Sequence, residues 1–252
     1  MEITREQFAR VGGLLPVQRG NVRIDNYTFV NAVLWIVRTG CPWRDLPAEF
    51  GNWYSVYQRF SRWARAGVIE RLFVALQTER IVSVGVEVLA LDSTSAKVHP
   101  HGHGSLKKRG GQAIGRSRGG RNTKIHVVSV DDRTVAEIHL GPGNVHDSPE
   151  GRVSIAALPV VPEGTPLLMD RAYEGDSTRA AARAAGLVPV VPPKANRWNP
   201  WEHDEELYKR RNEVERVFRR IKHYRKVFTR YDKLDVIYLA VVMLAFVAIH
   251  LK

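Results

Sequence analysis

Residues 86–92 read Val86-Glu87-Val88-Leu89-Ala90-Leu91-Asp92, an apolar run that ends on a carboxylate. A short run of this kind, rich in valine and leucine, predicts a buried strand. A second run, Pro166-Leu167-Leu168-Met169-Asp170, has the same form. An aspartate directly after a buried strand lies at the rim of a sheet, where the active sites of α/β folds collect. Asp92 and Asp170 are therefore candidate site residues.

The segments around these two runs predict a mixed α/β domain over residues 83–252. Two strands, 123–130 and 134–140, are joined by the turn Asp131-Asp132-Arg133, and a short strand follows at 187–191. Helices are expected at 148–158, 177–185 and 206–226, and a last apolar helix begins at Asp235. The pattern is that of a sheet flanked by helices.

A third acid comes from the predicted helix 206–226. At about 100° per residue, Tyr208, Arg211, Glu215 and Lys222 fall on one narrow stripe, and Glu213 is turned away from it. Two strand-end aspartates and a helical glutamate make a candidate site for hard divalent cations, which prefer oxygen ligands. On periodicity alone, the better explanation of this helix is an amphipathic basic helix with ordinary salt bridges.

Residues 1–82 predict a separate helical domain. Asp25 and Asn52 are N-caps of two helices, and Gly40 ends the first of them. The second helix offers Gln58, Arg59, Arg62 and Arg65 on its outward face. Two such helices form either a helix-turn-helix with a basic recognition helix or a small bundle whose charges are solvated. This segment alone leaves both open.

The chain of 252 residues carries a formal net charge of +12 and has a pI of about 10.1, which favours a polyanionic partner over a neutral metabolite. Between Lys97 and Lys124 there are eight Lys or Arg and no acid. Such a run is either solvated or follows a phosphate backbone. The cations expected to contact DNA are Arg59, Arg62, Arg65, Lys107, Lys108, Arg109, Arg116, Arg118, Arg121, Lys124, Arg219 and Lys226.

Several motifs together resemble one family. Tyr208, Arg211, Glu215 and Lys222 match the Y-x2-R-x3-E-x6-K signature of bacterial DDE transposases of the insertion sequence 5 family. The resemblance extends over Leu91-Asp92-Ser93-Thr94, Thr123-Lys124-Ile125-His126, Gly143-Asn144-Val145-His146-Asp147, Leu168-Met169-Asp170-Arg171-Ala172-Tyr173 and the N-terminal run from Arg38 to Pro47. It implies a ribonuclease-H-like catalytic domain. Glu215 follows Asp170 by only 45 positions, so no large inserted subdomain is expected.

The resemblance also implies an activity. Asp92, Asp170 and Glu215 would hold two Mg²⁺ ions, with Mn²⁺ able to substitute, and Asp92 would bridge them. The reaction would be cleavage at the terminal inverted repeats of the element and strand transfer into target DNA. Tyr208, Arg211, Lys222 and Asp147 would be accessory residues. The partners would be double-stranded DNA and a second copy of the chain, since two DNA ends must be held.

Two other functions stay open. A DNA-binding derivative or transposition repressor would keep the fold without cleavage, although it would have little reason to keep the intact acids. A ribonuclease or repair nuclease would explain the acids but not the N-terminal domain or the signature helix.

The remaining features concern the cellular compartment, a possible membrane span and other candidate binding residues. A single cysteine, Cys41, excludes a disulfide framework and fits a reducing compartment, so a cytoplasmic, nucleoid-associated bacterial protein is expected. The apolar run 236–251 is short for a membrane span and predicts a core helix. His99, His101 and His103 lack acidic partners nearby and are not expected to bind zinc. Trp198 and Trp201 are expected to pack in the core, with stacking on an unpaired base as the alternative.

Overall fold

The computed structural model describes residues 2–20, 22–102 and 111–251. It divides into two compact units. Unit 1 comprises Met1–Gln77, Val98–Gln112 and Arg220–Lys252, and unit 2 comprises Thr78–Lys97 and Ala113–Arg219. The C-terminal residues thus belong to the same unit as the N-terminal ones. The expected division of the chain into domains 1–82 and 83–252 stays a prediction.

Unit 1 is mainly helical, and its helix ends follow the capping signals of the sequence. Asp25 accepts a hydrogen bond from the Thr28 amide at the start of α2, and Gly40 ends that helix with φ 69°. Asn52 caps α3 through the Tyr54 and Ser55 amides. The elements are α1 (Arg5–Gly12), α2 (Asn26–Thr39), the 3₁₀ turns η1 (Trp43–Asp45) and η2 (Ala48–Phe50), α3 (Trp53–Arg65), α4 (Val68–Val84, ending in unit 2), η3 (Pro100–Gly102), α10 (Arg225–Phe228), β7 (Thr229–Arg230) and α11 (Asp235–Leu251).

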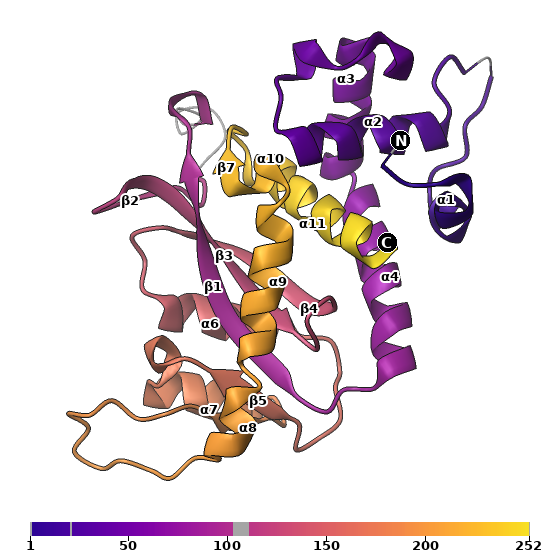
Figure 1. Cartoon of the computed structure of the whole chain (residues 1–252). Helices are drawn as coiled ribbons and strands as arrows, with labels where there is room; N and C mark the ends of the chain where they lie inside the picture. The colour runs from indigo at the N-terminus through magenta and orange to yellow at the C-terminus, as the bar shows by residue number, and fades with distance from the viewer. Residues whose placement is uncertain (1, 21, 103–110, 252) are drawn as a thin grey trace. The chain divides into compact units, whose positions relative to one another are not determined.

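Unit 2 holds the sheet (Figure 1). Its elements are β1 (Leu89–Val98), β2 (Gly115–Ser117), β3 (Gly120–Ser129), β4 (Val135–Pro142), α6 (Asp147–Ala156), β5 (Pro166–Met169), η4 (Arg171–Tyr173), α7 (Asp176–Ala184), β6 (Val188–Val190), α8 (Glu205–Lys209) and α9 (Asn212–Lys222, ending in unit 1).

The sheet is mixed, and its order is β4-β3-β1-β5-β6, with β2 also paired to β3. Strand β3 is antiparallel to both of its neighbours β1 and β4, whereas β5 runs parallel to β1 and β6 parallel to β5. With helices on its flanks, this is the mixed α/β arrangement that the sequence predicted. The antiparallel pair β3–β4 turns at residues 131–133, as expected.

The main core of unit 2 lies between the sheet and helices α6 and α7. It joins Leu91 of β1, Val128 of β3, Met169 of β5, Ile155 of α6 and Ala182 of α7, which are all buried. Val214, Val217 and Phe218 of helix α9 are buried, and Figure 1 shows α9 crossing the face over β1. Burial on two faces makes the sheet a rigid support for side chains at its rim.

Three expected elements differ from the structure. The strand that carries Asp92 continues to Val98, so Asp92 lies within β1 and not at its end. The predicted helix 206–226 is divided into α8, α9 and α10. The break at Arg210 and Arg211 has a local cause, because Arg211 N bonds to Tyr208 O and Val214 N to Arg211 O, the tighter spacing of a 3₁₀ turn. Helix α4 also runs to Val84, whereas the sequence pattern predicts a helix over 68–76 only.

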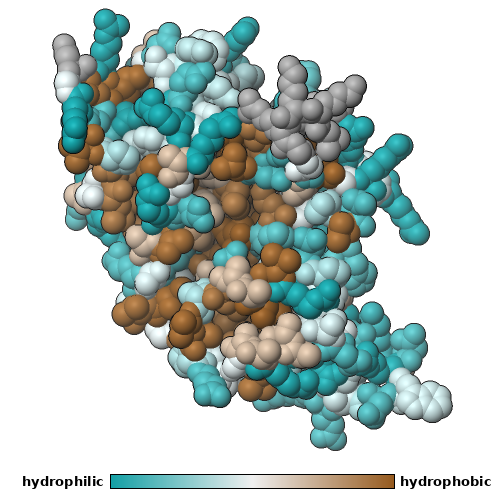
Figure 2. Space-filling model, turned by 180° about the vertical axis from the view of Figure 1, so that it is seen from behind, coloured by the Kyte–Doolittle hydropathy of each residue, from teal (hydrophilic) through white to brown (hydrophobic). Residues whose placement is uncertain are grey.

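The apolar run 236–251 forms the buried helix α11, as predicted. Among the described residues, no helix combines the length and hydropathy needed to span a bilayer. On the face in Figure 2, apolar side chains are interspersed with hydrophilic ones.

Candidate active site

Strand register brings the two predicted aspartates to the same level of the sheet. Leu91 of β1 is the partner of Met169, the last residue of β5. The next residues along the parallel pair are Asp92 and Asp170. The chain leaves the sheet at Asp170, whose Oδ1 accepts a hydrogen bond from the Ala172 amide at 2.7 Å and so begins η4. The expectation of neighbouring strand aspartates therefore agrees with the structure, although only Asp170 lies at a strand end.

Arg211 links the strand acid to the helical acid. Its Nη1 donates to Oδ2 of Asp92 at 2.7 Å, and its Nη2 donates to Oε1 of Glu215 at 3.0 Å. Its Cζ also lies 5.9 Å from the ring centroid of Tyr208. Glu213 points elsewhere and pairs with Arg210 at 3.5 Å. Arg211, Glu215 and Tyr208 thus gather at Asp92, and Glu213 does not.

Asp92 is a perturbed acid. Burial raises the pKa of its carboxyl to about 6, and the nearby Asp170 acts in the same direction. The Ser93 amide, which donates to Oδ1 at 2.7 Å, and the Arg211 guanidinium both oppose that rise in pKa. A desolvated carboxylate with a specific charge partner is typical of functional sites.

A second cluster lies around Asp147 at the start of α6. Its Oδ1 accepts from Lys124 Nζ at 2.8 Å and from Ser93 Oγ at 3.1 Å. Lys124 also donates to the Val145 carbonyl at 2.9 Å. Ser93 directly follows Asp92 in β1. Through the bond between Ser93 and Asp147, the second cluster therefore contacts the strand that carries the first acid. Asp147 was predicted as an accessory acid, and Lys124 as a DNA contact.

Sequence reasoning missed the buried pair His126 and Tyr173. His126 Nδ1 and the Tyr173 hydroxyl are 3.1 Å apart, and both side chains are fully buried. Burial lowers the pKa of His126 to about 4. In the strand register, His126 lies opposite both Ser93 and His139, so a polar row crosses three strands. The period-two alternation of Lys124 and His126 in β3 was the available signal.

The remaining predicted residues are dispersed. Arg116, Arg118, Arg121 and Arg219 are exposed, as a DNA contact requires. Lys222 is exposed and pairs with no acid of the described chain. Lys226 is buried and lies 5.2 Å from the ring centroid of Tyr231, so its expected contact with DNA is inconsistent with the structure. Lys107, Lys108 and Arg109, with His103, lie outside the described residues.

The N-terminal arginines are not equivalent. Arg62 and Arg65 are exposed on α3, as expected. Arg59 is only partly exposed and packs inward, with its Cζ 4.2 Å from the ring centroid of Phe29 and 4.7 Å from that of Trp63. Its expected place on the outward face is therefore wrong.

The two tryptophans of the segment before α8 also differ in how far they are buried. Trp201 packs against the core of unit 2, and its Nε1 donates to the Val191 carbonyl at 2.9 Å. Trp198 is fully exposed.

No group of three or more His, Cys, Asp or Glu stands ready to hold a metal ion anywhere in residues 2–20, 22–102 and 111–251. The donor chemistry nevertheless fits a hard divalent cation, because three carboxylates come from β1, the end of β5 and α9. The Arg211 guanidinium lies between two of them and already supplies a positive charge there. In this structure the positive charge of Arg211 therefore neutralises Asp92 and Glu215.

The mixed sheet carries acids on β1, directly after β5 and on α9, an arrangement that fits an enzyme domain. Residues 85–249 match the transposase DDE domain, and residues 3–73 match a domain described as a putative transposase of the IS4/5 family. The first match covers well over half of the chain, so this protein belongs to the DDE transposases. Domains of this family generally use divalent metal ions.

Two curated relatives are themselves uncharacterised. The chain is 34% identical over 111 residues to protein y4sN of Sinorhizobium fredii (strain NBRC 101917 / NGR234), covering 42% of this chain and 85% of that protein. It is 30% identical over 82 residues to a 16.2 kDa protein of insertion element IS402 from Burkholderia cepacia, covering 31% and 56% of the two chains.

Two solved structures are similar at low identity. The piggyBac transposase in a synaptic complex with hairpin DNA is 11% identical with a TM-score of 0.38, over 78% of this chain and 48% of that one. The Mos1 transposase in a paired-end complex with the left transposon end is 12% identical with a TM-score of 0.29, over 89% and 83%. The chain thus spans about half the length of the piggyBac transposase chain.

Proposed function

We propose that this transposase cleaves DNA at the terminal inverted repeats of its insertion sequence and joins the freed 3′ end to target DNA. Asp92, Asp170 and Glu215 hold two Mg²⁺ ions in this proposal, and Mn²⁺ substitutes for them. The observation that carries it is the Arg211 guanidinium, which lies between Asp92 and Glu215 at the level of the sheet where Asp170 follows β5. Acids far apart in sequence gather there around one positive charge.

Bound divalent ions would supply Lewis-acid activation of the attacking oxygen and stabilisation of the leaving oxygen of the phosphodiester. The protein's own part is to concentrate negative charge from three rigid segments and to orient the substrate. Arg211 presents a planar set of donors that suits a phosphate as well as a carboxylate. When the guanidinium leaves the two acids, it is positioned to donate to a phosphate beside the scissile bond.

Lys124 and Tyr208 complete the substrate contacts in this proposal. Lys124 is half-buried and held by Asp147 and the Val145 carbonyl, so its ammonium loses little freedom when it contacts a phosphate. Tyr208 lies beside Arg211 and is placed to contact the flanking nucleotide. Lys222 is retained as an accessory residue on the family signature alone.

The partners follow from the reaction. The substrate is double-stranded DNA carrying the ends of the element, and both ends must be held at once, which calls for a homodimer in the DNA complex. A polyanionic partner accords with the net charge of +12. The site of action is the bacterial nucleoid.

The test uses the full chain and a labelled duplex that carries the terminal inverted repeats. With Mg²⁺, we expect nicks or breaks at the repeat boundary, and with EDTA none. Asp170→Asn should abolish cleavage and keep DNA binding. Glu163→Gln removes an exposed acid elsewhere in unit 2 and is the control, with cleavage as in the wild type. Binding without cleavage by the wild type would favour the alternative, a non-cleaving derivative or transposition repressor.

A further inference from the structure

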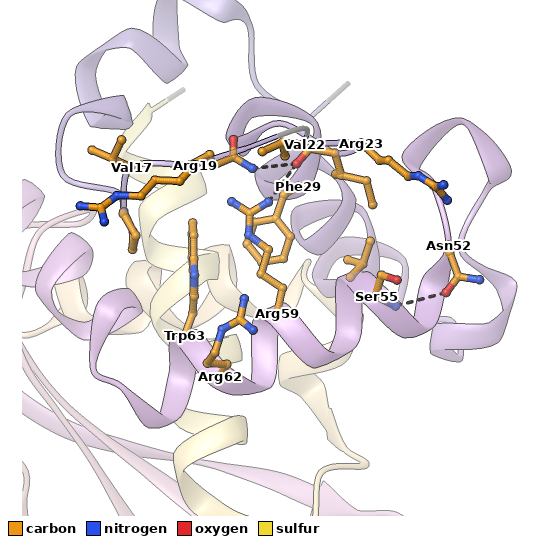
Figure 3. A pocket seen from close by; sticks show the side chains of 15 residues that line it. Val17, Arg19, Val22, Arg23, Phe29, Asn52, Ser55, Arg59, Arg62 and Trp63 are labelled. Atoms are coloured by element: carbon orange, nitrogen blue, oxygen red, sulfur yellow. Dashed lines mark hydrogen bonds between the residues drawn. The ribbon is translucent and has the colours of Figure 1, made fainter.

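A basic cavity of about 570 Å³ lies in unit 1, between the segment 16–24 and helices α2 and α3 (Figure 3). Four arginines line it, Arg19 and Arg23 from the segment and Arg59 and Arg62 from α3. The rings of Phe29 and Trp63 form part of its wall. The cavity belongs to unit 1 alone, and the chemistry proposed for Asp92 and its neighbours does not use it.

Arg59 is built into the wall of this cavity. It stacks on both aromatic rings, and its guanidinium donates to the Ile24 carbonyl at 3.1 Å and to the Asn26 side chain. It thereby ties the segment 16–24 to α3. Burial and the charge of Arg62 lower the pKa of Arg59 to about 10, so it remains charged at neutral pH.

The other cations of the cavity are uncompensated. Arg19, Arg23 and Arg62 are exposed, and none of them forms an ion pair with an acid of the described chain. The neighbouring acid is Asp25, whose carboxylate is engaged by the Thr28 amide and hydroxyl at the start of α2. The cavity therefore has an excess of positive charge, and its natural ligand is an anion.

The charges are spread along a path and do not converge on one point. In Figure 3, Arg19 and Arg23 extend in opposite directions along the rim, with Arg59 between them. Arg62 also lines a second hollow of about 390 Å³ together with Arg65, Gln58 and Ser61. Spaced arginines match the repeated charges of a polynucleotide, which carries one charge per about 1.7 Å of duplex axis, better than a single small anion.

We propose that this path is the DNA-backbone site of unit 1. Arg19, Arg23, Arg62 and Arg65 contact successive phosphates, and Arg59 is a positioning residue that holds the segment 16–24 against α3. The inference rests on the proposed function for its ligand, the DNA of the element's ends. It differs from a recognition helix that reads bases through Arg59, because Arg59 is committed to the protein and half of the contacts come from the segment before α2.

A consequence separates binding from stability. Arg59 and Arg62 line the same cavity with like charges, and after burial the charge of Arg62 is the next cause of the lowered pKa of Arg59. Removal of the Arg62 charge should therefore leave the free protein at least as stable while it weakens DNA binding. A residue with only a structural role would show the opposite result.

The experiment measures binding of the full chain to a fluorescein-labelled random-sequence duplex in EDTA over a range of NaCl concentrations. Arg19→Gln, Arg62→Gln and Arg65→Gln should each reduce the slope of log K against log[NaCl] by about 0.9, and the double variant Arg19→Gln/Arg62→Gln by about twice that. The melting temperature of Arg62→Gln should equal or exceed that of the wild type. Arg38→Gln is the matched control, because Arg38 is already neutralised by Glu2 at 2.7 Å, and its slope should not change.

Wild-type slopes in Arg19→Gln and Arg62→Gln would overturn the proposal. So would displacement of the duplex by inorganic phosphate at constant ionic strength, which would assign the cavity to a free anion, or tighter binding of an RNA strand than of the duplex. Cleavage is not measured and EDTA excludes metal ions, so failure of the catalytic proposal would leave these slopes unaffected.

Discussion

Arg211 donates from Nη1 to Oδ2 of Asp92 at 2.7 Å and joins residues that are 119 positions apart in the chain. The contact connects the break between α8 and α9 to the central strand β1. The same guanidinium reaches Glu215, so one cation neutralises two of the three proposed metal ligands. The protein itself therefore stabilises the negative charge at this rim of the sheet, and in the proposed reaction a metal ion would take the place of the arginine.

Arg211→Ala tests this exchange. In EDTA the variant should lose about 1–3 kcal/mol of unfolding free energy, because two charge-assisted hydrogen bonds are removed and Asp92 stays desolvated. Mg²⁺ should then raise the melting temperature more in the variant than in the wild type, since the ion no longer competes with the guanidinium. The measurement is thermal unfolding with and without Mg²⁺. A variant that melts like the wild type in EDTA, with no added response to Mg²⁺, would refute the exchange.

Glu215 and Glu213 offer a matched pair on one helix. Glu215→Gln should reduce cleavage by at least about 10²-fold, the size typical for loss of a group that stabilises transition-state charge, and should retain DNA binding. Glu213→Gln should cleave nearly as the wild type does, because Glu213 pairs with Arg210 outside the cluster. Gel assays of cleavage and of binding on the same duplex decide the matter. Equal activity in both variants would remove Glu215 from the site.

The sequence predicted which acids lie near one another better than it predicted the bounds of the elements that carry them, and the role of these acids as metal ligands stays a prediction. Apolar runs before Asp92 and Asp170 marked β1 and β5, and the stripe separated Glu215 from Glu213. The end of β1 was missed because Ser93, Thr94 and Ser95 are polar, and such a run shows no burial pattern although it pairs with β3 as far as Lys97. Strand pairing is a non-local property that periodicity does not reveal.

Arg59 shows a second limit. Helical spacing places Arg59 beside Val56 and Trp63, at the edge of the buried face, so its position on the helix does not determine whether its side chain points inward or outward. The side chain points inward because it contacts Phe29 of α2 and the Ile24 carbonyl, both far away in sequence. Tertiary partners of this kind also explain why His126 and Tyr173 were missed.

The buried His126 predicts a pH dependence of stability. Its pKa is about 4 in the folded protein, against about 6.5 in an unfolded chain, so the unfolded state binds the extra proton between these values. Stability should fall as the pH drops below about 6.5 and should lose about 3 kcal/mol from this group by pH 4. Tyr173, Asp147, His139 and Lys124 face the ring, and of these Asp147 alone favours protonation.

Urea unfolding across this pH range should therefore be flatter in His126→Gln than in the wild type, whatever its absolute stability. His223→Gln changes an exposed histidine and should keep the wild-type pH profile. Parallel profiles for the wild type and His126→Gln would show that His126 does not titrate as proposed.

Gly151 of α6 sets how closely that helix approaches the sheet. A Cβ atom there would lie 2.5 Å from Cε1 of Tyr173 and 3.2 Å from Cδ2 of Leu91. Overpacking of this kind costs about 1–3 kcal/mol, more than the gain of up to about 1 kcal/mol from alanine in a helix. Gly151→Ala should therefore lower the urea midpoint, whereas Gly119→Ala, whose Cβ meets nothing closer than 3.9 Å, should not. An unchanged midpoint in Gly151→Ala would mean that α6 shifts freely.

Trp198 and Trp201 should respond in opposite ways to truncation. Trp201→Ala removes the hydrogen bond to the Val191 carbonyl and the ring on which Arg179 stacks with its Cζ 3.5 Å from the centroid, so it should cost about 3 kcal/mol in urea unfolding. Trp198→Ala removes a fully exposed ring and should change stability by less than about 0.5 kcal/mol.

If Trp198 stacks on an unpaired base, its loss should weaken binding to a duplex with one unpaired terminal base by about 1–3 kcal/mol. Trp198→Phe should restore most of that binding because it keeps an aromatic face. Equal affinity of Trp198→Ala and the wild type for that duplex would exclude stacking, since no folding defect would obscure the comparison.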